Sequence, residues 1–236
     1  GVLDWPSQGS VPVFTRAASQ PLRPRRQGRE GRGALVTHIF IYRRNVERVG
    51  PHWDTMADAL RLALEEQPDL LVLPGDYVQA YPEEHEAQQR AFLELFRQEE
   101  VQAPLGVFAV QGDMEWGWDW SVLFEPVVQL FGSTRTQSIN EEITMTGLVL
   151  TDSKNPYFSL YEPPSEEQFH ILVGHSPDFV LGGVAGDLVL AGHTHGGQVQ
   201  LPFFGPPLTF SQLPRDWTSG RTELPSGGTL IVSRGI

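Results

Sequence analysis

The sequence contains no cysteine, which excludes disulfide bonds and thiolate ligands for a metal. It also has no run of about 20 apolar residues, the length that a membrane-spanning helix needs. No signal-peptide pattern is visible, but Gly1 is not a natural start, so we expect that upstream sequence is missing. The expected location is therefore the cytoplasm or the surface of a membrane.

Lysine is almost absent as well, because Lys154 is the only lysine in the chain. The formal net charge of −12 is spread unevenly, since residues 1–50 hold nine arginines against three acidic residues. The acidic remainder is a poor match for nucleic acid, and we expect no nucleic-acid partner. The basic segment could contact an anionic membrane surface or a phosphate, or it could be a solvated arm.

The residues that are present are typical of a layered α/β domain. Apolar runs that end in Gly or Pro alternate with helical patterns at residues 55–66 and 82–100, which favours largely parallel strands. After residue 140 helical patterns become rare, and this indicates a second sheet packed on the first. The expected strands are 34–41, 69–73, 105–110, 143–150, 170–173, 188–191, 198–201 and 229–233.

The chain divides into two parts by composition. Residues 1–33 are rich in Pro, Gly and Arg and predict an irregular lead-in, with one short strand at 11–15. Residues 34–236 form the expected domain.

Polar side chains collect where the expected strands end, and each group follows a glycine that permits a tight turn. Sites in such sheets form beyond the carboxyl ends of the strands. Two carboxylates and three imidazoles placed in this way indicate a metal centre, and this mixture suits Mn, Fe, Zn or Ni. The candidate ligands are Asp76, Asp113, His175, His193 and His195.

These candidates differ in how specific they are. Asp76 alone could be a turn or helix-cap residue, and His175 could be an ordinary turn histidine. The run Gly-His-Thr-His-Gly-Gly-Gln at 192–198 is harder to explain by packing, because two histidines framed by glycines make a poor core element. We interpret this run as metal-binding.

The order of these blocks resembles the calcineurin-like metallophosphoesterase family, and the resemblance covers roughly residues 34–235. It is closest to a bacterial branch in which the 192–198 block precedes a Leu-Pro turn, here Leu201-Pro202. That branch includes enzymes acting on phospholipids and on nucleotide-linked lipid A precursors. The resemblance implies a four-layer α/β/β/α sandwich that holds two metals and clamps a phosphate. Ser233-Arg234-Gly235 resembles a late block after which the family usually continues, so we expect that a C-terminal piece is absent.

The resemblance also implies a role for each matched residue. Asp76 would bridge the two metals. Asp113, His175 and His193 would complete one metal, and His195 would belong to the other.

The block that should open the family pattern is the first departure. The family has Asp-x-His at the end of its first strand, but no acidic residue occurs between Glu30 and Glu47. One metal would keep only Asp76 and His195, too few ligands for a firm site, so we expect one metal and a doubtful second. His52 or Asp54 could supply a replacement ligand.

Two arginines, Arg43 and Arg44, lie near this missing block. One guanidinium could take the place of the lost cation and bind a phosphate with two hydrogen bonds. Alternatively, both are surface arginines.

The second departure is Met114, which stands where the family has a histidine that protonates the leaving group. Methionine has no proton to give and is a poor ligand for a hard ion. A general acid is commonly worth about 10²–10⁴ in rate, so catalysis should be weakened. Asp113 replaces an asparagine, which keeps an oxygen ligand and adds a negative charge.

Three tryptophans alternate after this block, at Trp116, Trp118 and Trp120. They could line an apolar or lipid-binding groove beside the metal, or they could belong to the core. Exposed tryptophans would favour the groove.

Two functions are compatible with this pattern. The first is a metal-dependent phosphoesterase of weakened or atypical activity, acting on an ester or pyrophosphate of a phosphorylated small molecule or lipid. The second is a catalytically inactive relative that binds a ligand or a protein. The four surviving ligand positions favour the first.

Overall fold

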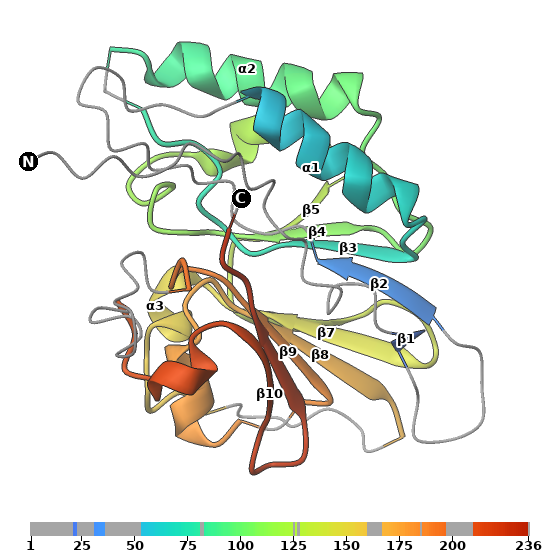
Figure 1. The fold of residues 1–236 in the computed structure, drawn as a ribbon, viewed down its shortest axis with the longest axis vertical. Helices are drawn as coiled ribbons and strands as arrows, with labels where there is room; N and C mark the ends of the chain where they lie inside the picture. Colours follow the sequence, from blue (N-terminus) through green and yellow to red (C-terminus); the bar gives the residue numbers. More distant parts are fainter. Residues whose placement is uncertain are drawn as a thin grey trace, which may run out of the picture.

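The structure is a computed structural model that describes part of the chain. Described in full are residues 53–80, 83–124, 126, 128–159, 167–184, 186–196 and 210–235, together with the backbone of 21–22 and 31–35. These residues form two β-sheets that lie one above the other, with two long helices on the far side of the first sheet (Figure 1).

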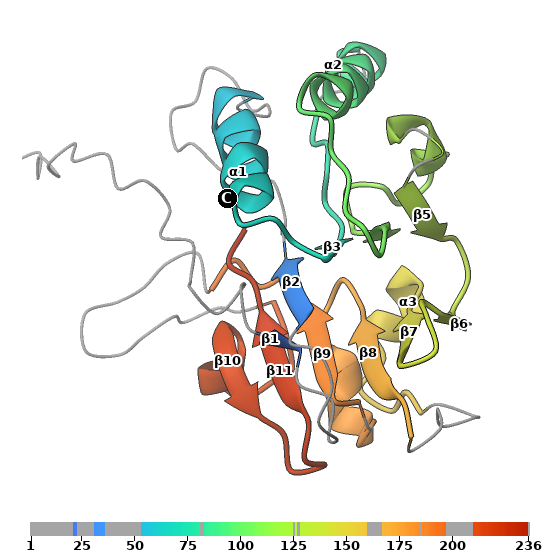
Figure 2. The ribbon, with the colours of Figure 1, turned by 90° about the vertical axis from the view of Figure 1, so that its right-hand side faces the viewer.

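The first sheet contains the strands from the N-terminal half of the chain. Its order is β1 (Pro21–Leu22), β2 (Gly31–Leu35), β3 (Leu70–Leu73), β4 (Val107–Val110) and β5 (Val128–Phe131). Strands β2 to β5 are parallel, and only β1 runs antiparallel to its neighbour. Helices α1 (Trp53–Glu65) and α2 (His85–Gln98) connect successive parallel strands and cover the outer face, as Figure 2 shows.

The second sheet contains the remaining strands. Its order is β10 (Gly220–Glu223), β11 (Thr229–Val232), β9 (Leu188–Ala191), β8 (Phe169–Val173), β7 (Ile143–Gly147) and β6 (Arg135–Ser138). The four inner strands are parallel and the two edge strands are antiparallel. Short helical turns connect several of these strands: α3 (Leu150–Ser153), η3 (Asp178–Gly182) and η4 (Arg215–Trp217). A further turn, η2 (Trp120–Leu123), lies between β4 and β5 of the first sheet.

Alternation along the central strands divides the core into layers. In β3 and β4 every side chain is buried, and successive residues point to opposite faces, as the period of a strand requires. Leu71, Leu73, Val107 and Ala109 face the helices, whereas Leu70, Val72, Phe108 and Val110 face the second sheet. The outer face of the second sheet packs against η3, chiefly through Phe179 and Val180.

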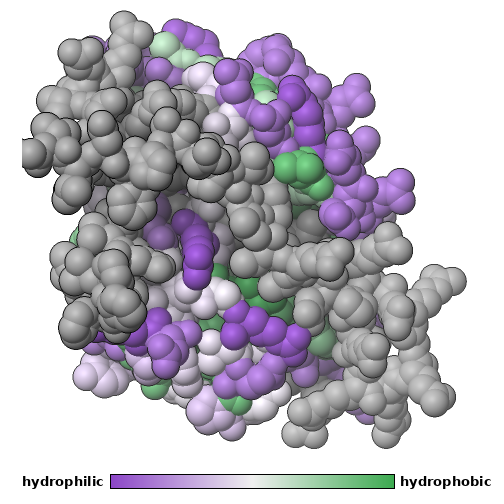
Figure 3. Space-filling model, viewed as in Figure 1, coloured by the Kyte–Doolittle hydropathy of each residue, from purple (hydrophilic) through white to green (hydrophobic). Residues whose placement is uncertain are grey.

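The two long helices present an apolar stripe to the first sheet. Met56 and Leu60 of α1 are four residues apart and fully buried, and Phe92 and Phe96 of α2 repeat this spacing. Hydrophilic side chains gather over the outer sides of the helices (Figure 3). No helix in the described residues is both long enough and apolar enough to cross a membrane.

The expected α/β class is confirmed, and both long helices form where the sequence predicted them, with boundaries shifted by one to three residues. The strand expected at 143–150 ends at Gly147, because residues 150–153 form α3 instead. Strand β2 begins at Gly31, within the segment expected to be irregular. The strands expected at 11–15 and 198–201 lie outside the described residues.

Removing a side chain from the core between the first sheet and its helices should destabilise the fold. Leu71 is fully buried under α1 and α2, so Leu71→Ala should lower the free energy of unfolding by about 2–5 kcal/mol. Leu62 of α1 is 40% exposed, and Leu62→Ala should change stability by no more than about 0.5 kcal/mol. Urea unfolding of both variants tests this, and equal losses would contradict the layer assignment.

Candidate metal centre

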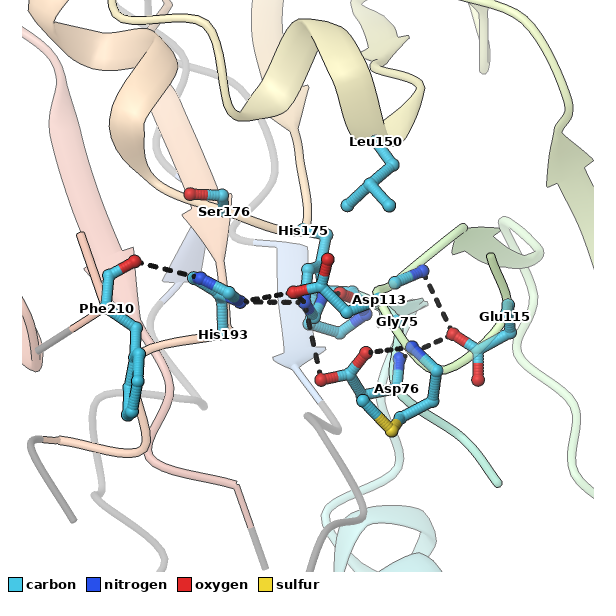
Figure 4. A network of polar contacts seen from close by, with 12 residues as sticks. Gly75, Asp76, Asp113, Glu115, Leu150, His175, Ser176, His193 and Phe210 are labelled. Atoms are coloured by element: carbon cyan, nitrogen blue, oxygen red, sulfur yellow. Dashed lines mark hydrogen bonds and ion pairs between the residues drawn. The ribbon is translucent and has the colours of Figure 1, made fainter. Parts of the chain in front are cut away.

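Four loops carry the candidate ligands, and each follows a parallel strand. Asp76 follows β3 and Asp113 follows β4, both in the first sheet. His175 follows β8 and His193 follows β9, both in the second sheet. Because the sheets face each other with these ends on the same side, the four side chains converge from both sheets (Figure 4).

The convergence is close enough for a single ion. One ligand atom from each of the four residues lies within 4.8 Å of all the others. His193 Nδ1 is 2.9 Å from Asp113 Oδ2 and 3.2 Å from His175 Nε2. His175 Nε2 is 3.4 Å from Asp76 Oδ2 and 3.6 Å from Asp113 Oδ2. Asp76 and His175 are buried, whereas Asp113 and His193 are half-buried, so the cluster is open on one side.

The outer nitrogen of each histidine in the cluster contacts a backbone carbonyl. His175 Nδ1 is 2.7 Å from the carbonyl oxygen of Pro74, and His193 Nε2 is 3.0 Å from that of Phe210. A carbonyl only accepts, so these nitrogens carry the protons. The opposite nitrogens face the cluster. A bound ion would displace any proton that they carry and leave the tautomer that histidine ligands of metals adopt.

These residues fit a divalent cation. Two imidazole nitrogens and two carboxylate oxygens meet in the cluster, and this set of ligand atoms suits Mn, Fe, Zn or Ni. Ligands bound at about 2.0–2.2 Å from one ion are roughly 3.0–3.6 Å from one another. The distances between the ligand atoms fall between 2.9 and 3.6 Å for four pairs.

The electrostatics of the cluster favour positive charge. Burial alone would lower the pKa of His175, but the charge of Asp76 and the hydrogen bond with Asp113 outweigh it and raise this pKa to about 10. Burial alone would raise the pKa of Asp113, but hydrogen bonds from the two histidines and Lys154 lower it well below its ordinary value. The two carboxylates therefore favour positive charge at this point, and a divalent cation could supply it in place of the proton on His175.

Glu115 joins the two ligand loops of the first sheet. Its fully buried carboxylate accepts backbone N–H groups from Asp76 at 2.8 Å, Tyr77 at 2.7 Å and Gly112 at 3.0 Å. Asp76 has a φ of 60°, in the left-handed region that residues other than glycine seldom adopt, and these bonds stabilise it there. Burial and the charge of Asp76 raise the pKa of Glu115 to about 7.

The two loops approach each other so closely that only glycine fits between them. A Cβ on Gly75 would lie 2.6 Å from Gly112 Cα and 2.7 Å from His175 Nδ1. With a φ of 95°, Gly75 also has a backbone conformation that other residues avoid. The Gly-Asp pattern seen in the sequence therefore has two causes, a turn and a close contact.

Met114 still contributes through its backbone. Its N–H donates to Asp76 Oδ1 at 2.9 Å, so residue 114 orients a ligand although its thioether has no proton to give. On the other side of the cluster, the ammonium group of Lys154 forms an ion pair with Asp113 Oδ1. The sequence singled out Lys154 only as the lone lysine and assigned Glu115 no role.

The remaining candidates separate from the cluster. His195 is half-buried with a φ of 51° and, within the described residues, does not belong to the group of four. Its assignment to a second metal stays a prediction. Arg43, Arg44 and the stretch that should hold the Asp-x-His block lie outside the described residues.

The three tryptophans take three different positions. Trp116 follows the Asp113 loop and is 62% exposed. Trp118 is half-buried and donates from Nε1 to the carbonyl of Met114 at 2.8 Å, whereas Trp120 is buried in the core beside Tyr77. Of the three, only Trp116 is exposed, as the expectation of a groove requires.

Comparison with known proteins identifies the family. Residues 37–197 match the model of the calcineurin-like phosphoesterases. The chain is 32% identical over 223 residues to the uncharacterized metallophosphoesterase YkuE of Bacillus subtilis (strain 168), covering 87% of this chain and 76% of the relative. An uncharacterized metallophosphoesterase of Aquifex aeolicus (strain VF5) is 30% identical over 216 residues, 85% of this chain and 78% of that relative.

A third relative carries a more specific name. Phosphodiesterase YaeI of Escherichia coli (strain K12) is 28% identical over 165 residues, 64% of this chain and 58% of the relative. The chain belongs to the calcineurin-like phosphoesterase family, as the order of the sequence blocks predicted. The family consists of metal-dependent hydrolases of phosphate esters, and the cluster of Asp and His side chains could hold such a metal.

Replacing Glu115 should disturb both stability and metal binding. Glu115→Gln keeps the shape but turns an NH₂ group toward a backbone N–H, so the free energy of unfolding should fall by about 1–3 kcal/mol. The affinity for Mn²⁺ should fall about tenfold or more because Asp76 loses its support.

Glu142→Gln is the matched control, since Glu142 is exposed and precedes β7, at the end of the strands opposite the loops that carry the cluster. Urea unfolding and calorimetric titration with Mn²⁺ measure both effects. If the two variants behaved alike, Glu115 would not be the support of this loop.

Proposed function

We propose that this chain hydrolyses a phosphate ester or a pyrophosphate with one divalent ion held by Asp76, Asp113, His175 and His193. The observation that supports it is the convergence of four acceptor atoms from four strand ends, with both histidines oriented by carbonyls. Without a cation this arrangement would cost free energy, because the two carboxylates of the cluster would repel each other.

The chain's own residues determine what this centre can do. When bound, a divalent ion supplies positive charge that polarises a phosphoryl oxygen and lowers the pKa of water. The half-buried side, where Asp113 and His193 lie, is the side from which a phosphoryl group can approach. Mn, Fe, Zn and Ni all suit this donor set. A second ion would depend on Asp76 and His195.

We propose further that turnover is weak or atypical. Met114 contacts Asp76 through its backbone N–H but offers no acidic proton to a leaving oxygen. Loss of a general acid commonly costs about 10²–10⁴ in rate. Substrates with a good leaving group, which needs no proton, should therefore be hydrolysed much faster than alkyl esters.

The substrate proposed is a phosphorylated small molecule or a lipid. Trp116 supports an apolar portion, because its exposed indole follows the loop that carries Asp113. The name of the Escherichia coli relative, a phosphodiesterase, makes diesters the first class to assay.

Removing one ligand should abolish both metal binding and turnover. The purified protein should bind about one Mn²⁺ per chain and hydrolyse aryl or bis-aryl phosphates. His193→Ala and Asp76→Ala should each lower metal affinity and rate by about 100-fold or more. His85→Ala is the control, because this imidazole packs on Trp118 and lies outside the cluster.

Two results would contradict the proposal. Failure to bind Mn²⁺, Fe²⁺, Zn²⁺ or Ni²⁺ would remove the metal centre. One ion per chain without turnover of any ester, including aryl esters, would instead indicate the inactive, ligand-binding alternative.

A further inference from the structure

The ion pair between Lys154 and Asp113 places a cation at the metal cluster. Asp113 uses Oδ2 toward the two histidines and Oδ1 toward the Lys154 ammonium group. The ammonium and the cluster are thus separated by a single carboxylate. No other lysine occurs in the chain, so this position is not one of many interchangeable surface lysines.

The backbone that carries Lys154 is fixed to the same loop as His175. Lys154 N donates to the carbonyl of Leu150 at 3.1 Å and ends the short helix α3. The preceding residue, Ser153, is fully buried, and its Oγ accepts from Ser176 N at 3.3 Å. Ser176 directly follows His175, so this hydrogen bond joins α3 to the histidine loop.

Packing between α3 and this loop is also tight. A Cβ on Gly174 would lie 2.9 Å from Ser153 Cβ. The start of the lysine side chain is therefore held in place, although its end reaches solvent. The pairing with Asp113 follows from this placement.

The ammonium group can bind more than Asp113. It has three N–H donors, and one is directed at Asp113 Oδ1. The Lys154 side chain is 40% exposed and that of Asp113 is 25% exposed, so both lie at the open side of the cluster. The other two donors can reach an oxygen of a molecule that enters from solvent.

Charge balance identifies the kind of molecule. Two carboxylates and one divalent ion sum to zero with neutral imidazoles, and a phosphate monoester brings close to two further negative charges. The histidine that the family has at position 114 is replaced by a methionine, which carries no charge. The metal ion alone would therefore leave the negative charge of a bound phosphate partly unbalanced, and a cation beside Asp113 could balance the remainder.

We infer that Lys154 binds a phosphoryl oxygen of the substrate beside the metal cluster and contributes the positive charge that residue 114 lacks. This inference rests on the proposed phosphoesterase function. The role is electrostatic binding and positioning, because a fixed ammonium donates hydrogen bonds to the phosphoryl group in the ground state and the transition state. Monoesters, which carry more charge, should depend on Lys154 more than diesters do.

The test compares Lys154→Met, Lys154→Arg and Arg221→Met with the wild-type protein, all loaded with Mn²⁺. Arg221 is the control, because it is a partly exposed cation paired with Glu223 on the β10 strand. Calorimetric titration with inorganic phosphate at low ionic strength measures binding without turnover. Metal content per chain and thermal midpoint are recorded for each protein.

Lys154→Met should bind phosphate about ten- to a hundredfold more weakly, as expected for loss of one charged hydrogen bond. Lys154→Arg should stay within about threefold of the wild type, and Arg221→Met should be unchanged. Metal content should be about one per chain in all four proteins. For an aryl phosphate the KM of Lys154→Met should rise more than for a bis-aryl phosphate.

Three results would overturn the inference. The first is that Lys154→Met and the wild type bind phosphate with equal affinity, and the second is that the Mn²⁺-loaded wild type binds no phosphate. The third is that Lys154→Met binds phosphate more weakly only because it has lost metal, and that Lys154→Arg does not restore the metal content. The last would show that Lys154 serves only to neutralise Asp113. Failure of the proposed function would give a different result. If no ester were hydrolysed but phosphate binding still depended on Lys154, the hydrolase function would be rejected and this inference would remain.

Discussion

The carboxylate of Glu115 makes the interaction on which the candidate metal centre depends. Backbone N–H groups from both ligand loops of the first sheet converge on its two oxygens, and the carboxylate is fully buried. A buried acceptor of this kind is costly to leave unpaired, so the loops and the carboxylate stabilise one another. Asp76 keeps its left-handed backbone conformation only because neighbouring groups hold it there.

Much of the fold and of the candidate site could be predicted from the sequence, because strong local signals coincide with buried structure. Apolar spacing predicted α1 and α2, and glycines after apolar runs predicted the loops of Asp76, Asp113, His175 and His193. Strands β5, β6 and β10 were not predicted. The sequences of β6 and β10, Arg-Thr-Gln-Ser and Gly-Arg-Thr-Glu, are polar edge strands stabilised by pairing rather than by burial, whereas β5 is a short edge strand of four residues. The contacts of Glu115 and Lys154 cross 38 and 41 positions of sequence, where no spacing rule applies.

At positions 113 and 114 the resemblance to the family leads us to expect an asparagine and a histidine, where this chain has Asp113 and Met114. Asp113 adds a negative charge, and Met114 adds none of the positive charge that an imidazole can carry. Lys154 pairs directly with the added carboxylate. The ion pair thus involves the same loop as the two positions at which the resemblance predicts other residues.

The ligands come in equal numbers from two sheets that are joined mainly by apolar side chains. An ion bound there would cross-link the two sheets at the edge where their loops meet. Metal binding would then be coupled to the folding equilibrium, and free ion at 100 times its dissociation constant would stabilise the native state by about 2.7 kcal/mol. A chelator should accordingly lower the free energy of unfolding, because removing the ion removes this cross-link between the two sheets.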